Sequence, residues 1–89
     1  MKGIITVLGK DQVGIIAKVC TYLSGQKVNI LDISQTIIQG YFNMMMIVDI
    51  SNAAQKFEQL SADLEGLGDQ MGLKIKLQHE DIFNSMHRI

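Results

Sequence analysis

The spacing of hydrophobic residues alternates along this chain between the period of a β-strand and that of an α-helix. The order of these changes constrains the fold more than any other feature does. A short aliphatic run and three stretches with a period of two predict four strands, and two stretches with three- and four-residue spacing predict helices between them. The strands are predicted at 4–8, 28–39, 41–49 and 73–78.

Each predicted helix carries an apolar stripe and recognisable end signals. Asp11 is positioned to cap the first helix by accepting a backbone N–H, and Gly25 to end it in the left-handed conformation. The second helix is predicted to start at Ser51 or Asn52. The stripes consist of Val13, Ile16, Val19, Cys20 and Leu23 in the first helix, and of Phe57, Leu60, Leu64, Leu67 and Met71 in the second.

Gln39 and Gly40 predict a two-residue turn that joins the second and third strands into a hairpin. This turn sets a register in which Ile33 opposes Met46, Leu31 opposes Val48 and Ile30 opposes Asp49. A bulge would exchange the two faces beyond it. The face away from these core pairs is predicted to carry Met45, Ile47 and Ile30.

The element order predicts an α+β, ferredoxin-like βαββαβ fold, an antiparallel sheet with two helices on one face. We expect a single domain over residues 1–89, with a core at about 2–78. A short amphipathic C-terminal helix is predicted at about 80–89, carried by Ile82, Phe83, Met86 and Ile89. The uncovered sheet face is of the kind that forms interfaces, so the terminal helix or a second copy of the chain is expected on it.

Composition excludes several classes of protein. The chain has 89 residues, of which 47% are hydrophobic and 19% charged, with a net charge of -1. So small a domain is marginally stable alone, which favours association. No apolar run approaches the roughly 18 residues of a membrane span, and no basic stripe favours nucleic acid. Gly9 and Lys10 interrupt the only candidate secretory signal, and the chain has a single cysteine, so a cytoplasmic location is expected.

No residue pattern predicts a catalytic centre, a metal site or a cofactor. His79 and His87 lack cysteines or carboxylates at the spacing of a tetrahedral site. Cys20 lies within an apolar stripe and is expected to be a core thiol. Asp32 and Asp49 are predicted to be diagonal and solvated rather than an acid–base pair. We therefore expect no enzyme activity of the chain's own.

The segment from Gly9 to Val19, followed by Leu23 and Val28–Ile30, resembles the signature of ACT domains. The resemblance covers residues 2 to about 78. Two segments, 29–36 and 82–89, are also similar to the small stand-alone ACT proteins of the UPF0237 group. Val13 departs from the pattern, because many relatives have proline there. The resemblance implies a regulatory module that binds amino acids or similar small ligands, generally as a dimer or larger assembly. It places the ligand between the first loop of one subunit and the start of the second strand of another.

The first loop supplies a physical argument of its own. Glycine near a helix start costs up to about 1 kcal/mol relative to alanine, so Gly14 needs another reason. A bare helix N-terminus offers amides and a positive dipole end to a carboxylate. Asp11, or Asn29 of an adjoining subunit, would accept a hydrogen bond from the ligand's ammonium. The predicted ligand-binding residues are Asp11, Gln12, Val13, Gly14, Ile15, Asn29 and Ile30.

Structural roles for the same residues stay open from the sequence. Asp11 would serve only as a cap, Gly14 only for tight packing, and Asn29 only to shape a turn. The leading hypothesis is a homodimeric small-molecule module without catalysis, in which ligand binding favours one dimer arrangement or one partner surface. One alternative is a ligand-independent subunit that docks on an enzyme or regulator through its C-terminal helix or open sheet face. Another is a small enzyme whose active site forms between subunits.

Overall fold

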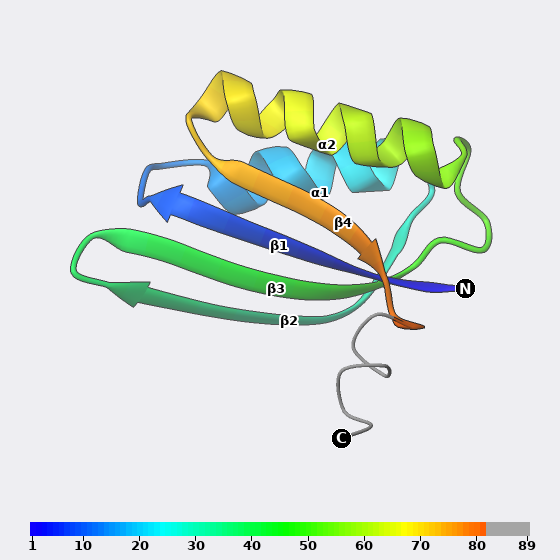
Figure 1. The fold of residues 1–89 in the computed structure, drawn as a ribbon, viewed down its shortest axis with the longest axis horizontal. Helices are drawn as coiled ribbons and strands as arrows, with labels where there is room; N and C mark the ends of the chain where they lie inside the picture. Colours follow the sequence, from blue (N-terminus) through cyan, green and yellow to red (C-terminus); the bar gives the residue numbers. More distant parts are fainter. Residues whose placement is uncertain (82–89) are drawn as a thin grey trace.

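The chain folds into two layers, an antiparallel sheet with both helices on one side (Figure 1). This computed structural model describes residues 1–81. The strands lie in the order β2-β3-β1-β4, so the ferredoxin-like βαββαβ prediction is confirmed. The predicted C-terminal helix falls largely on 82–89, outside the described residues. The elements are β1 (Lys2–Lys10), α1 (Ile15–Gly25), β2 (Asn29–Ile38), β3 (Tyr41–Asp49), α2 (Phe57–Met71) and β4 (Lys74–His79).

The core fills the space between the sheet and the helices. In β3, every second side chain is buried, from Phe42 through Met44 and Met46 to Val48, while Met45 is exposed. This alternation follows from the period of two in a strand. The stripe predicted for α2 is confirmed, with its members buried or packed against the core. Among residues 1–81 no polar or charged side chain is buried, and none of their helices is long and apolar enough to cross a bilayer.

The β2–β3 hairpin has the predicted turn, with φ of 50° at Gln39 and 81° at Gly40. Two positive values in succession are typical of the tight turn that matches strand twist. The predicted register holds from Ile38 to Asp32. A bulge then shifts the pairing, so that Ile30 rather than Leu31 opposes Val48. The prediction that Ile30 lies on the uncovered face was therefore wrong, because the extra residue exchanges the faces beyond it.

Two helix boundaries also differ from prediction. Gly25 is the last residue of α1 but does not end it in the left-handed conformation, which Lys27 adopts instead with a φ of 59°. The second helix starts at Phe57, not at Ser51 or Asn52. In the segment before this helix, backbone N–H groups form hydrogen bonds within the loop. The N–H of Ser51 donates to Oδ1 of Asp49 (2.9 Å), and the N–H of Ala54 donates to the carbonyl of Gln26 (2.8 Å).

Strand β2 is an edge strand that the helices leave uncovered. It pairs with β3 on one side only, and its other side is the margin of the sheet (Figure 1). Leu31, Ile33, Ile37 and Ile38 are between 41% and 63% exposed. A long, apolar, unpaired edge is a typical template for pairing with another strand.

Candidate functional site

The first loop, residues 11–14, joins β1 to α1 beside the β2–β3 turn. The N–H of Asp11 donates to the carbonyl of Gly40 at 2.8 Å. From the other side, Nε2 of Gln12 donates to the carbonyl of Met71 at 2.7 Å. This bond satisfies one of the last carbonyls of α2, which have no partner within the helix. The loop is thus held between the hairpin turn and the end of α2.

The start of α1 has no side-chain cap among the described residues. Gly14 is the N-cap, with φ 90° and ψ 5°, and its carbonyl accepts the N–H of Lys18 at 3.0 Å. The predicted capping by Asp11 was wrong. The helix begins at Ile15, four residues later, and a capping side chain reaches only two or three residues on. The first-turn amides, and with them the positive end of the helix dipole, are left free of any side-chain acceptor.

Gly14 owes its identity to backbone conformation rather than to packing. A Cβ built on it would meet nothing within 4 Å, which excludes the alternative of tight helix–strand packing. Its φ of 90° lies where residues with a side chain are strained. The same open space leaves the amides of the first turn accessible from outside.

The neighbours of Gly14 divide into exposed and buried residues. Val13 is fully exposed, and Ile16 is 36% exposed, so their assignment to the apolar stripe of the first helix was wrong. Ile15, at 2% exposure, takes their place in the core with Val19 and Leu23. Ile15 can therefore offer a ligand only its backbone, whereas Val13 offers an apolar side chain.

The other predicted site residues, Asn29 and Ile30, begin β2 at the far end of α1. They line an open concavity of about 460 Å³ together with Ser24 and Lys27. Neither Ser24 nor Lys27 stood out in the sequence. The signal that could have found them is their place between the end of a helix and the start of the edge strand. Cys20 also lines this concavity; it is half-buried and packs against the core, in line with the expected structural thiol.

One subunit does not bring the two parts of the predicted site together. The loop at Gly14 precedes α1 and Asn29 follows it, and a helix of 11 residues is about 16 Å long at 1.5 Å per residue. A ligand that touches both parts must therefore lie between two copies of the chain.

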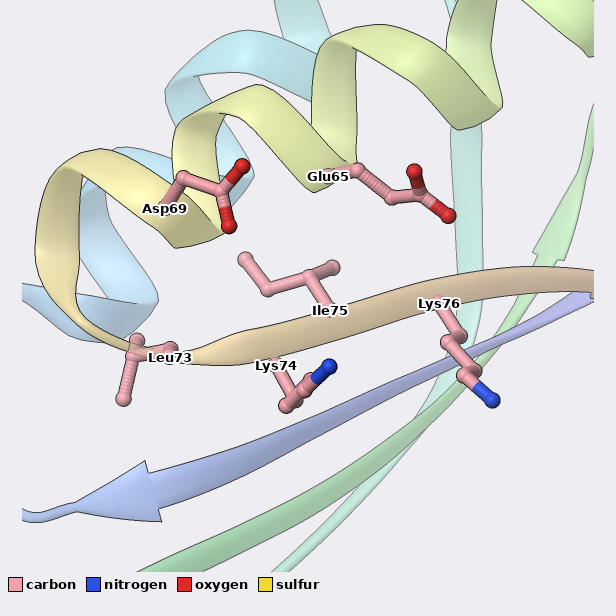
Figure 2. Close-up of a pocket in the computed structure, with 6 residues that line it drawn as sticks. All are labelled: Glu65, Asp69, Leu73, Lys74, Ile75 and Lys76. Carbon is pink, nitrogen blue, oxygen red and sulfur yellow. The ribbon is translucent and has the colours of Figure 1, made fainter.

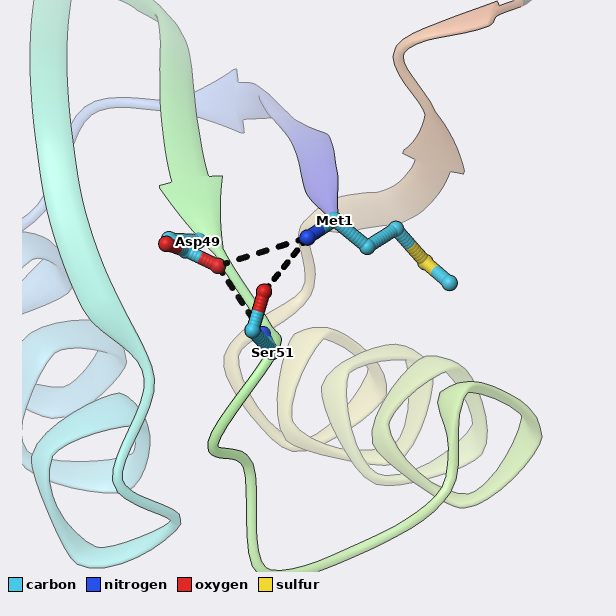
Figure 3. A network of polar contacts seen from close by, with 3 residues as sticks. All are labelled: Met1, Asp49 and Ser51. Atoms are coloured by element: carbon cyan, nitrogen blue, oxygen red, sulfur yellow. Dashed lines mark hydrogen bonds and ion pairs between the residues drawn. The ribbon is translucent and has the colours of Figure 1, made fainter.

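Two carboxylates outside the loop, Asp49 and Asp32, make structural contacts. Around Asp49, the terminal amine of Met1 lies 3.6 Å away and also donates to Oγ of Ser51 (Figure 3). Hydrogen bonds from the side chain and N–H of Ser51 hold the pKa of Asp49 below its usual value. Asp32 accepts the N–H of Ile33 at 2.9 Å. Within residues 1–81 no three metal-ligating side chains converge.

Comparison with known proteins shows which family this chain belongs to. The family model of the ACT domain matches residues 3–78. The chain belongs to the ACT domain family. A UPF0237 protein from Bifidobacterium longum is 64% identical over 88 residues, which cover 99% of this chain and 98% of the relative.

Solved structures agree with the family assignment. An ACT domain protein from Streptococcus pneumoniae superposes with a TM-score of 0.81 at 43% identity, over 93% of each chain. A formyltetrahydrofolate deformylase from Pseudomonas syringae gives 0.80 at 17% identity, over 88% of this chain but 27% of the deformylase. At that identity the second likeness concerns the fold alone. The resemblance of the first loop to the ACT signature is thus confirmed at the level of the family.

Proposed function

We propose that this ACT domain is a non-catalytic regulatory module, and that it binds an amino acid between two copies of the chain. The observation that carries the proposal is the uncapped start of α1 at Gly14. A ligand carboxylate there would accept the free amides and lie at the positive end of the helix dipole. The exposed carboxylate of Asp11 is close along the chain and would accept a hydrogen bond from the ligand's ammonium.

The second copy would join through the edge of β2. On the helix side of the sheet, Ile33 and Ile37 are 41% and 56% exposed, more than a core position allows. No lysine or proline protects the strand against pairing. The N–H of Ile33 is accepted by the carboxylate of Asp32, and a pairing strand would replace this bond.

Pairing of β2 with β2 accounts for both parts of the site. In an antiparallel pair around a two-fold axis near Ser34, Asn29 of one copy opposes Gln39 of the other, because each is five positions from Ser34. The first loop adjoins that turn through the bond from Asp11 to Gly40. Asn29 of one copy, with Lys27 from the same concavity, would then face the free amides of its partner.

A ligand screen tests this function. Each of the twenty amino acids is added while the melting temperature is followed, and at least one should raise it with increasing concentration. A ligand at 100 times its Kd stabilises by about 2.7 kcal/mol. In ¹⁵N-labelled protein the same amino acid should shift the amide signals of 14–17 more than those of α2.

Matched glycine variants separate binding from folding. Gly14→Leu and Gly72→Leu both place a side chain at positive φ in open space, so both should lower the melting temperature. Only Gly14→Leu should lose the further rise caused by the amino acid. A wild-type protein that responds to none of the twenty would favour the ligand-independent interaction subunit instead. Turnover of a metabolite by the pure protein would favour an enzyme.

The remaining expectations about partners stay predictions. Docking through the C-terminal helix depends on 82–89, outside the described residues. The cytoplasmic location, the lack of a cofactor and the lack of a nucleic-acid partner are likewise predictions from composition.

A further inference from the structure

The side of the sheet away from the helices, here called the outer face, has a pattern that the proposed ligand site does not explain. Strand pairing places the outward residues of the four strands in rows across it. In the three central rows the middle strands contribute mostly apolar side chains and the two margins contribute polar ones. These rows consist of Asp32, Ser34 and Thr36 from β2, Asn43, Met45 and Ile47 from β3, Ile4, Thr6 and Leu8 from β1, and Lys74, Lys76 and Gln78 from β4. The ends of the same face carry Ile38, Tyr41, Asp49, Lys2 and Lys10.

The middle of the outer face presents apolar surface to the outside. Leu8 is 55% exposed and Met45 is 41% exposed, while Ile4, which pairs with Ile47 and Gln78 across the strands, is buried. The surface is hollowed on both sides of this middle strip. One hollow of about 320 Å³ lies at the β4 margin and one of about 80 Å³ at the β2 margin.

The two lysines of β4 have no anionic partner within residues 1–81. Figure 2 shows Lys74 and Lys76 pointing away from α2, on the opposite side of β4 from the carboxylates of Glu65 and Asp69. No ion pair in the described part of the chain includes either lysine. Their ammonium groups therefore belong to the outer face.

The outer face is therefore electrically polarised across its strands. Its β4 margin carries two positive charges and its β2 margin carries the negative charge of Asp32. Three strand spacings of about 4.8 Å separate these margins by about 14 Å. The opposite charges are thus too far apart to pair within one copy.

Two orientations of a two-fold axis can be compared by the charges that each brings together. If a second copy packs outer face to outer face around a two-fold axis parallel to the strands, each β4 lies over the partner's β2. If the axis lies across the strands, β4 lies over β4 and the lysines repel each other. Only the first arrangement joins the apolar strips and also opposes unlike charges.

We propose that the outer face is a self-association surface, on which a second copy packs sheet to sheet about a two-fold axis parallel to the strands. Lys76 of each copy then lies over Ser34 of the other, and Asp32 lies in the next row along the same strand, twice by symmetry. Two antiparallel sheets pack in this way with their strands within about 30° of each other. This interface is separate from the β2 edge. The two-fold axes of the two interfaces do not intersect, so both interfaces together would extend the assembly rather than close it as a tetramer.

Charge exchange on the full-length chain tests the proposal by sedimentation equilibrium. Lys76→Glu and Asp32→Lys should each weaken association by at least about tenfold, because each brings like charges close together across the interface. The double variant should recover most of the wild-type affinity, since the pair is restored with its signs exchanged. Lys18→Glu, on the exposed side of α1, makes the same charge change and should have no effect.

The outcomes separate this surface from the ligand site. Loss in the single variants with recovery in the double variant supports the outer face, whether the product is a monomer or an edge-paired dimer. Association that is the same in wild type, both single variants and the double variant overturns the proposal. It would leave residues 82–89 or another protein as the occupant of the outer face. Failure of the amino-acid screen would not alter either result.

Discussion

Gly14 and Gly68 are glycines for two different physical reasons. Gly14 adopts a φ of 90° with open space around it, whereas Gly68 lies inside α2 with ordinary helical backbone. A Cβ on Gly68 would come within 2.7 Å of the carbonyl oxygen of Leu73, which belongs to the backbone and cannot turn aside. The first glycine is needed for conformation and the second for close packing of α2 against the start of β4.

Gly68→Ala should therefore destabilise the protein although alanine favours helices. Relief of a 2.7 Å contact requires α2 to shift, which typically costs about 1–3 kcal/mol. Gly66→Ala is the matched control, because nothing lies within 4 Å of its added Cβ and helix propensity should stabilise it by up to about 1 kcal/mol. Urea unfolding of both variants measures the difference. A gain in stability from both would show that Gly68 is not tightly packed.

At the scale of elements, a hydrogen bond joins the two helices. The hydroxyl of Tyr22 in α1 donates to Oδ2 of Asp63 in α2 at 2.6 Å, and Gln59 donates to the other oxygen at 2.7 Å. The bond from Tyr22, followed by that from Gln59, lowers the pKa of Asp63. Burial, with a smaller contribution from Asp63, raises the pKa of Tyr22.

Tyr22→Phe should lower stability in a pH-dependent way. A carboxyl whose pKa is lower when folded stabilises the protein above its unfolded pKa, and the effect is lost as pH falls through the folded pKa. The stability difference between wild type and Tyr22→Phe should thus be largest above about pH 4 and shrink below it. Urea unfolding at several pH values measures this, with the exposed Tyr41→Phe as control. A constant difference from pH 7 to pH 2 would contradict the assigned role of Asp63.

Most elements could be predicted from the sequence because periodicity and turn chemistry agreed. The turn at Gln39 and Gly40 fixed the register as far as Asp32. The bulge could not be predicted, because Ile30 and Leu31 are both apolar and either one satisfies a period of two. The start of α1 was misplaced for a similar reason, since Val13 and Ile15 fit the stripe equally well.

The residues of the candidate site could be named from the sequence, but their arrangement in space could not. Gly14 and Asn29 both stood out in the sequence, and α1 necessarily places them apart within one subunit. In the proposed assembly they come together only between two copies, and periodicity and motifs in one chain do not indicate how two copies would be arranged. The exposed edge of β2 supplies the missing step, because it shows where a second copy can pair.

For the whole molecule, the two proposed interfaces occupy different surfaces and can be separated by single substitutions. Ile37 is 56% exposed on the helix side of β2, and Ile37→Lys should block pairing of the β2 edges. Leu8 is 55% exposed on the outer face, and Leu8→Lys should instead weaken packing of the outer faces. Both positions are exposed, so the subunit itself should keep most of its stability.

Ile37→Lys should therefore abolish the rise in melting temperature with the amino acid, because the ligand would lose the partner's Asn29. Leu8→Lys should keep that rise while lowering the mass seen in sedimentation. If Ile37→Lys leaves the ligand response intact, the ligand does not lie across the β2 edge. The two readouts, ligand response and mass, assign each surface its own role.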